Sequence, residues 1–276
     1  MMKNIYMILL TVVAALYACS SDDAVVEQKT FEAGKTYFMT VDATKGVNET
    51  ASPTYRRALT LSGNTLTPTW AIGEKVYVYP TTSVTPFWFD GCLEAKSAGS
   101  TTQLDGALSL PSGWTEDISV YIGYAPQFKL QFPRSGDLDY TGQVGTLSDI
   151  ATKYDYAIAT GVMFDIENDH ITAINTATFE SQQAIVKFTL NDGTDALSPT
   201  ALTIAYGSEP LELTRIPNTT YTTNGAGILF VAVPGFTDAN VTLTATCSSG
   251  TYTYTRSNVT FANGKYYEIS VKMKKQ

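Results

Sequence analysis

Short runs of alternating hydrophobic and polar residues recur along this chain, and most end at proline, glycine or a small polar residue. Residues 128–132 alternate cleanly and end at Pro133, and residues 75–79 end at Pro80. A period of two is typical of half-buried β-strands, and turn residues at the ends strengthen that prediction. The other predicted strands are residues 36–43, 54–60, 118–124, 154–160, 184–190, 202–206, 227–233, 241–246, 251–256 and 266–273. No segment of useful length has a persuasive 3.6-residue period, so the pattern predicts an all-β fold.

The number of predicted strands bears on domain organisation. About twelve strands are too many for one small sandwich. We therefore expect two β-sandwiches in tandem, joined around residues 166–182.

The first predicted strand has the clearest two-faced pattern. Tyr37, Met39 and Val41 share one face with Ala43, whereas the other face is polar apart from Phe38. A polar loop is expected from Lys45 onward, so this strand stands apart from the denser strands that follow.

Composition and charge narrow the chemistry. The 276 residues include 18 Lys and Arg against 26 Asp and Glu, a net charge of −8, and a single histidine, His170. An acidic chain is a poor match for nucleic acid, whose phosphates need a basic face. One histidine excludes two-histidine metal motifs, and no glycine-rich phosphate loop is present. We expect no catalysis, no cofactor and no metal.

The first nineteen residues have the pattern of an export signal. Lys3 is followed by the apolar run 5–16, which is too short to span a membrane. Leu16-Tyr17-Ala18-Cys19 resembles a bacterial lipobox, in which cleavage before Cys19 precedes lipidation of its thiol. Ser20 to Asp23 resemble the surface-export signal of Bacteroidota lipoproteins. An ordinary secretory signal with a chance cysteine remains the alternative.

Two further cysteines, Cys92 and Cys247, lie in different halves of the chain. A disulfide is permitted in an exported protein. We favour two separate thiols, because cysteines in different domains rarely meet.

The dibasic pair Arg56-Arg57, followed by Ala58, is the sharpest candidate for processing. It lies in a polar loop after a proline, where a trypsin-like protease has access. Cutting after Arg57 would separate the strand at 36–43 from the body, although an ordinary surface pair remains the alternative.

Other candidate sites have simpler explanations. Asp165 to His170 has the alternating acids of a calcium loop, but His170 stands where that loop needs glycine, so a solvated turn between domains is favoured. Four carboxylates are most simply loop or strand-end charges: Glu74, Asp90, Glu94 and Asp105. The tryptophans could form a sugar-stacking platform, although aromatic residues in sandwiches are more often core: Trp70, Trp88 and Trp114.

Taken in order, these elements resemble the fimbrillin family, the lipoprotein pilins of Bacteroidales. The matching elements are the lipobox at Cys19, the Arg57-Ala58 junction, Leu66 to Val78 with Trp70-x-x-Gly73-Glu74-x-Val76-x-Val78, Tyr154 to Ala157, Ala184 to Phe188 and Asn263 to Tyr267. The resemblance covers most of the chain.

The resemblance implies two transthyretin-like (Greek-key) β-sandwich domains in tandem. It divides the chain into a signal peptide (1–18), a tether with a propeptide strand (19–57), an N-terminal sandwich (58–175) and a C-terminal sandwich (176–276).

The resemblance also implies assembly by donor-strand exchange. An arginine-specific protease cuts between Arg57 and Ala58, the strand of Tyr37, Met39 and Val41 leaves, and a strand from another fimbrial subunit takes its place. Each apolar side chain exposed by that departure is worth about 1.5–3 kcal/mol when buried. Since release also leaves ladder edges unpaired, we expect replacement rather than simple loss.

The expected product is an adhesive subunit of a cell-surface fimbria. The precursor would be an outer-membrane lipoprotein, and a host or bacterial surface molecule would be its ligand. Stalk subunits of the family carry further strands that they donate, whereas this sequence stops at Gln276, after Lys272, Lys274 and Lys275. We therefore expect a tip or accessory subunit, unless residues 267–273 themselves are donated.

Two other functions remain open. The first is a surface glycan-binding lipoprotein of β-sandwich domains that uses tryptophans such as Trp88. The second is a glycoside hydrolase, which a pair of carboxylates facing one cleft would support.

Overall fold

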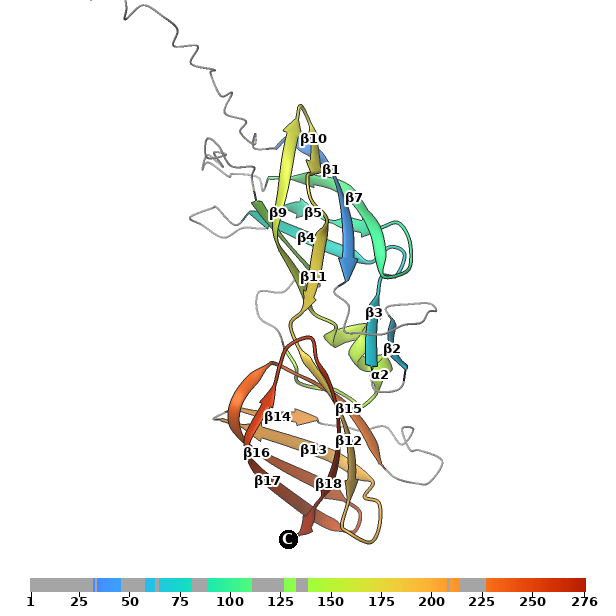
Figure 1. The fold of residues 1–276 in the computed structure, drawn as a ribbon, viewed down its shortest axis with the longest axis vertical. Coiled ribbons are helices and arrows are strands. Elements are labelled where there is room, and N and C mark those ends of the chain that lie inside the picture. The colour runs from blue at the N-terminus through green and yellow to red at the C-terminus, as the bar shows by residue number, and fades with distance from the viewer. Residues whose placement is uncertain are drawn as a thin grey trace, which may run out of the picture.

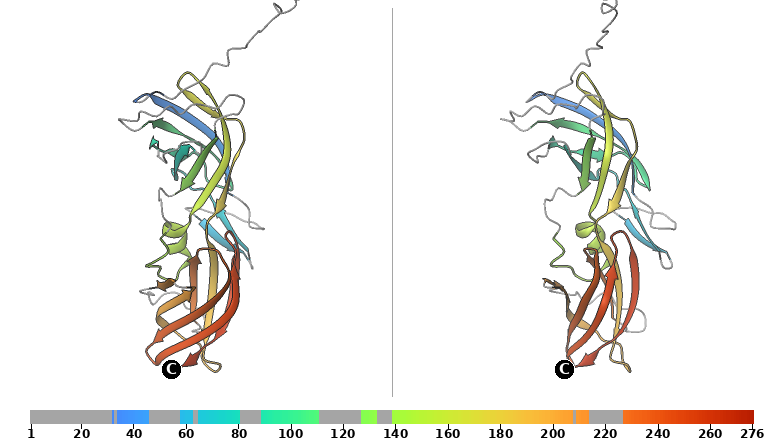
Figure 2. Two further views of the ribbon diagram at one scale, coloured as in Figure 1. Left: turned by 90° about the vertical axis from the view of Figure 1, so that its left-hand side faces the viewer. Right: turned by 60° about the vertical axis from the view of Figure 1, so that its left-hand side comes forward.

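The computed structural model describes residues 32, 34–45, 58–62, 65–80, 89–110, 127–132, 139–207, 209–213 and 227–276. It confirms the predicted all-β class. The described residues form two β-structured units that lie end to end along the longest axis, and Figure 1 shows the C-terminus at the far end of the second unit. The turned views in Figure 2 show the same arrangement. No helix within the described ranges is long and apolar enough to cross a membrane.

The first unit is one sheet that closes on itself. Its strands are β1 (Thr36–Lys45), β4 (Lys75–Pro80), β5 (Asp90–Gly91), β6 (Leu93–Ala95), β7 (Thr101–Ser109), β8 (Gln127–Phe132), β9 (Ala157–Glu167), β10 (His170–Ala173) and β11 (Ala177–Ser181). The sheet order is β10-β1-β11-β9-β8-β4-β6-β7-β5, and β1 also pairs with β7. Strands β1, β11, β9, β8, β4, β6 and β7 therefore follow one another around a ring. This pairing differs from the two separate sheets of a sandwich, because β1 joins what would be two free edges.

Alternation places the core of the first unit inside this ring. Leu93, Leu104 and Leu130 are fully buried there. Three rings pack together in this core, with centroids 5.0 Å apart for Trp70 and Phe179 and 5.6 Å apart for Phe132 and either partner. Edge-to-face and tilted contacts at this range are favourable geometries for aromatic pairs.

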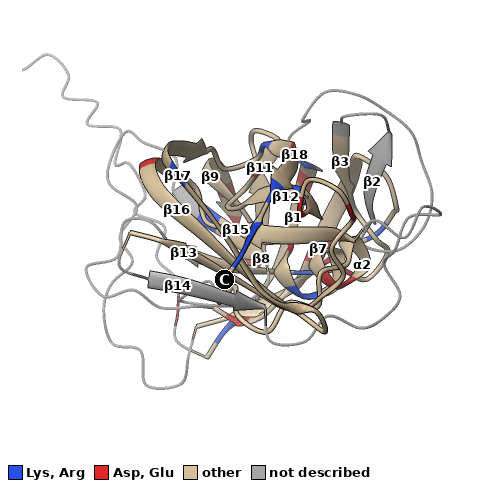
Figure 3. Cartoon of the chain, turned by 90° about the horizontal axis from the view of Figure 1, so that it is seen from below, with Lys and Arg blue, Asp and Glu red and all other residues tan. Residues whose placement is uncertain are grey.

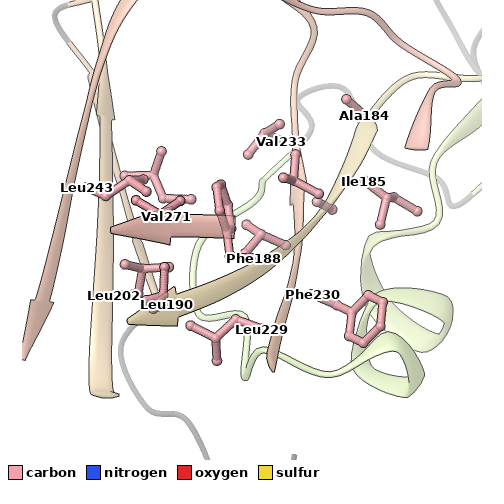
Figure 4. Close-up of a cluster of buried hydrophobic side chains, with 14 of the residues drawn as sticks. Ala184, Ile185, Phe188, Leu190, Leu202, Leu229, Phe230, Val233, Leu243 and Val271 are labelled. Carbon is pink, nitrogen blue, oxygen red and sulfur yellow. The ribbon is translucent and has the colours of Figure 1, made fainter. Parts of the chain in front are cut away.

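The second unit consists of two facing sheets. Its strands are β12 (Ala184–Asn191), β13 (Pro199–Tyr206), β14 (Glu209–Leu213), β15 (Ile228–Val233), β16 (Phe236–Cys247), β17 (Gly250–Phe261), β18 (Tyr266–Lys272) and β19 (Lys274–Lys275). The sheet β15-β12-β18 faces the sheet β14-β13-β16-β17-β19. Figure 4 shows Phe188 and Leu190 of β12 with Val271 of the adjacent β18 and Leu243 of β16 in the facing sheet. This apolar core takes up the buried residues of β12, which alternate with the partly exposed Lys187, Thr189 and Asn191 along the second half of the strand.

A small set of elements joins the two units. The hairpin of β2 (Ala58–Ser62) and β3 (Thr65–Thr69) lies between the two units, together with helix α2 (Leu147–Asp149) and the π-helical turn η1 (Ile150–Tyr154). Thr146 caps α2, since its Oγ1 accepts the Asp149 amide hydrogen bond at 3.1 Å. Leu66, Ile150 and Tyr154 pack into the core of the second unit, so these connecting elements are packed mainly against that unit.

Asp155 and the amide of Gln183 link the units by hydrogen bonds. Gln183 Nε2 donates to Asp155 Oδ1 at 3.4 Å, and Gln183 Oε1 accepts from the Tyr156 amide at 3.2 Å. Both Gln183 and Asp155 are buried. Buried polar groups of this kind are stable only when they are hydrogen-bonded, so these residues fix the passage from β9 to β12.

Candidate functional site: the groove filled by β1

Strand β1 is paired along both of its edges. It runs antiparallel to β7 from Thr36↔Ser109 to Thr44↔Thr101. On its other edge it runs parallel, first to β10 from Phe38↔His170 and then to β11 up to Lys45↔Phe179. Because β7 flanks it on one edge and β10 and β11 flank it on the other, β1 fills a groove whose walls come from distant parts of the chain.

The inward face of β1 is the one that the sequence pattern predicts. Tyr37, Met39 and Val41 are each 1% exposed and Ala43 is 2% exposed, whereas Phe38 on the outer face is 51% exposed. Full burial of such apolar side chains stabilises by about 1.5–3 kcal/mol each. The strand therefore contributes a substantial part of the core of the first unit.

Gly106 of β7 lies opposite Met39 and shapes the far wall of the groove. A Cβ atom at this position would lie 2.1 Å from the carbonyl oxygen of Cys92, a backbone atom that cannot swing aside. Cys92 is the residue between β5 and β6, both of which pair with β7. Glycine thus lets β7 hold these strands on one edge and β1 on the other.

The last residue of β1, Lys45, is a buried lysine that the sequence pattern assigned to a loop. Its Nζ donates to both carboxylate oxygens of Glu74, at 2.9 and 3.0 Å, and to the Thr69 carbonyl at 3.2 Å. Asp155 Oδ2 lies 3.6 Å from the same nitrogen. The side chains of Lys45, Glu74 and Asp155 are 2%, 0% and 5% exposed, respectively. Elsewhere on the described strands, basic and acidic residues are interspersed (Figure 3).

Two aromatic rings complete the surroundings of Lys45. Its Nζ lies 4.6 Å from the Trp70 ring centroid and 4.4 Å from that of Phe132. A cation over a ring face is attracted by the ring quadrupole, most strongly where water is excluded. Glu74 is further fixed by a hydrogen bond from the Ala71 amide at 3.1 Å. The expectation that Glu74 is an ordinary strand-end charge is therefore wrong, because its partner comes from β1.

The other predicted processing residues lie at or beyond the described ranges. Cys19 and Arg57 fall outside them. Ala58 begins β2 and pairs with Thr69, the residue whose carbonyl accepts from Lys45. Ala58, the first described residue after the candidate cut site, is therefore the strand partner of a residue that contacts the end of β1.

The remaining candidates do not converge on one site. Trp70 is 1% exposed and belongs to the core, while Trp88 and Trp114 lie outside the described ranges. Residues 165–170 form the hairpin of β9 and β10 inside the first sheet rather than a turn between domains, with Asn168 at φ 56° in its two-residue turn. Within the described ranges, no group of three or more metal-ligating side chains comes together.

The two described cysteines are free thiols in separate units. Cys92 is partly exposed in the first unit, and Cys247 is buried at the end of β16. Burial raises the pKa of the Cys247 thiol above its usual value, with a smaller opposing effect from the Ser198 backbone. A raised pKa disfavours the reactive thiolate, so Cys247 suits a packing role.

A cavity of about 220 Å³ lies in the second unit between β17 and β18. Apolar side chains such as Leu243, Tyr254 and Phe261 line it, together with Arg256 and Asn258. It shares no residue with the surroundings of β1.

Comparison with known proteins gives structural matches only. No family model matches the chain, and no curated protein matches it. The fold is similar to a fimbrial protein from Bacteroides ovatus, with 10% identity, a TM-score of 0.40 and coverage of 87% of this chain. The match spans only 49% of that protein, about half of its length.

Two further solved structures match over most of both chains. One is the tip fimbrial protein Mfa3 from Porphyromonas gingivalis with a C-terminal truncation, at 10% identity, a TM-score of 0.39 and coverage of 86% and 94%. The other is a fimbrial assembly protein from Parabacteroides distasonis, at 11% identity, a TM-score of 0.38 and coverage of 88% and 92%. The solved structures that this chain resembles thus include fimbrial proteins.

Proposed function

We propose that this chain is the precursor of an adhesive fimbrial subunit whose first unit exchanges β1 for a strand of a neighbouring subunit. The precursor is lipidated at Cys19 and held at the outer membrane. A cut between Arg57 and Ala58 then separates β1 from the body. The observation that carries the proposal is the position of β1, which is paired on both edges and buried along one face, yet is followed by the candidate cut site.

The pairing of β1 supports replacement rather than simple loss. Without β1, the described pairings leave β7 on one side and β10 and β11 on the other without their shared neighbour. Unpaired strand edges and an empty apolar groove bind another strand readily, since main-chain hydrogen bonds give affinity and side-chain pockets give selectivity. The precursor thus keeps its own groove filled until the cut.

The second unit supports the role of acceptor rather than donor. Strand β18 pairs with β12 from Tyr266 to Lys272, and Val271 and Met273 are 2% and 1% exposed. Donating this strand would open the core of the second unit. We therefore propose a tip or accessory position in the fimbria. The division into transthyretin-like domains at 58–175 and 176–276 stays a prediction, and β11 (177–181) pairs with strands of the first unit.

A strand-uptake assay tests this function. The purified chain is treated with an arginine-specific protease and incubated with an excess of a fluorescent peptide of residues 34–45. We expect the peptide to co-elute with the cut chain and not with the uncut chain. Because the chain contains other arginines, the Arg56→Ala/Arg57→Ala variant, treated identically, is the matched control. Retention of the original β1 with no uptake of the peptide would contradict the proposal.

A further inference from the structure

The surroundings of Lys45 belong to the body of the protein, not to β1. Thr69 ends β3 and Trp70 follows it, Glu74 immediately precedes β4, Phe132 ends β8, and Asp155 precedes β9. When β1 leaves, these groups stay behind as a pocket with two carboxylates, two ring faces and a carbonyl oxygen. Every group of the set attracts a cation, and Lys45 is the one described cation that contacts them.

From this arrangement we propose that the groove selects its incoming strand by a buried lysine. The accepted strand must place a lysine where Lys45 lies, at the ninth position of a segment whose first, third, fifth and seventh residues are apolar and face inward. The partner is thus a β-strand of alternating pattern that carries one lysine on its apolar face. This inference rests on the proposed function and names the partner strand of the same site.

Charge complementarity gives the physical reason. A wholly apolar strand would fill the places of Tyr37, Met39, Val41 and Ala43 but would leave two buried carboxylates without a cation. Removing one partner of a buried ion pair is strongly destabilising, because the remaining charge has lost both water and its counterion. Such a penalty against wrong strands is how binding sites gain specificity.

The geometry further favours lysine over arginine. The ammonium lies 4.4 and 4.6 Å from the centroids of two rings that pack against each other, while it donates toward Glu74 and Thr69. A compact ammonium donates in several directions at once, so one nitrogen serves both Glu74 and the Thr69 carbonyl, whereas a guanidinium donates only within its own plane and is larger. Arginine in the incoming strand should therefore bind less well than lysine.

Peptide competition on the cut chain tests the selection while the protein stays unchanged. Unlabelled peptides of residues 34–45 compete with the fluorescent peptide: the native sequence, Lys45→Met, Lys45→Arg and Lys35→Met. Lys35 is the matched control, because its side chain is 36% exposed and its loss changes the peptide charge equally. We expect Lys45→Met to weaken competition by about tenfold or more. Lys35→Met should change it by about twofold or less. Equal competition by the Lys45→Met and Lys35→Met peptides would overturn the proposal.

A second measurement separates this inference from the proposed function. If the cut chain takes up no peptide, strand exchange fails, and the need for a cation is then decided in the uncut chain. There, Lys45→Met should lower the melting temperature by about 5 °C or more relative to Lys35→Met. Adding Glu74→Gln and Asp155→Asn should recover part of that loss. A Lys45→Met chain that melts with the Lys35→Met chain would overturn the cation requirement on its own.

Discussion

The two units close their cores in different ways. The first is a ring that the described pairings close through β1, a strand whose neighbours lie far along the sequence in β7, β10 and β11. The second packs two sheets face to face around β12, and much of its pairing comes from successive hairpins such as β13–β14 and β16–β17. The first unit therefore depends on one segment that a single cut could separate, whereas the second has its strands within residues 184–275. This contrast is why we propose strand exchange for the first unit and not for the second.

The cores differ in chemistry as well as in closure. The first places a lysine, two carboxylates and three aromatic rings at the end of β1, whereas apolar side chains, aliphatic and aromatic, surround Phe188 and Leu190 in the second (Figure 4). An apolar core tolerates side chains of similar volume. A core with a buried charge accepts only strands that bring the counterion.

The largest expected effect comes from breaking the second core. Phe188→Ala should destabilise that unit by about 3–5 kcal/mol, because it empties the space of a ring that is 2% exposed. All three tryptophans precede residue 115, so tryptophan fluorescence reports on the first half of the chain. The denaturation curve from circular dichroism should shift, and the fluorescence curve should not. A parallel shift of both would show that the units unfold together. Thr189→Ala, on the partly exposed face of the same strand, is the control.

A change in β1 should have the reverse signature. Met39→Ala should cost about 2–5 kcal/mol, since the side chain is 1% exposed between β7 and β10. The tryptophan fluorescence transition, which includes the signal of the buried Trp70, should move to lower denaturant. The adjacent Phe38→Ala is the matched control: its ring points outward, so its effect should stay within about 0.5 kcal/mol. Equal effects of the two substitutions would mean that β1 does not close the first core.

The smallest expected effect concerns an ion pair in the second unit that contrasts with the buried pair of Lys45. Glu268 accepts from Lys187 at 2.9 Å and from the Tyr266 hydroxyl at 2.8 Å, and the Lys187 bond, followed by the Tyr266 bond, lowers the pKa of its carboxyl. With a folded pKa below the unfolded one, the stabilisation is present above the unfolded value and disappears as the pH falls through the folded one.

Glu268→Gln should therefore cost about 0.5 kcal/mol at neutral pH, because the carboxylate is 37% exposed and screened by water. The difference from the native chain should vanish in acid, as measured by urea denaturation from pH 7 to pH 2. A constant difference across that range would assign the effect to packing instead of charge.

The sequence predicts β1 well but does not predict what surrounds it. Alternation places Tyr37, Met39 and Val41 on one face because one side of the strand is buried and the other is not. Its main neighbour, β7, is missed, because residues 101–109 mix threonine, glutamine, aspartate and Gly106 with few large apolar residues. Strands β10 and β11 fall where the sequence predicts a connection between domains. Pairing of distant segments leaves no local signal in either partner.

The pocket around Lys45 is missed for a similar reason. Lysine is almost never fully buried unless it is paired, so a lysine at the end of an alternating run predicts a loop. The partners that reverse this expectation, Glu74 and Asp155, lie 29 and more positions away, and neither carboxylate looks unusual in its own segment. Glu74 does belong to the motif Trp70-x-x-Gly73-Glu74, the one local feature that could have drawn attention to it.

The carboxylate of Asp155 has a mechanical consequence. One oxygen lies 3.6 Å from Lys45 of β1, and the other accepts from Gln183 at 3.4 Å, next to the first strand of the second unit. A strand that places a lysine here is thus connected through Asp155 to the joint between the two units. Under the proposed exchange, a molecule whose groove holds such a strand would keep this contact at the joint, and one with an empty groove would lose it. In a filament of such subunits, resistance to bending would be set joint by joint, as each groove is filled.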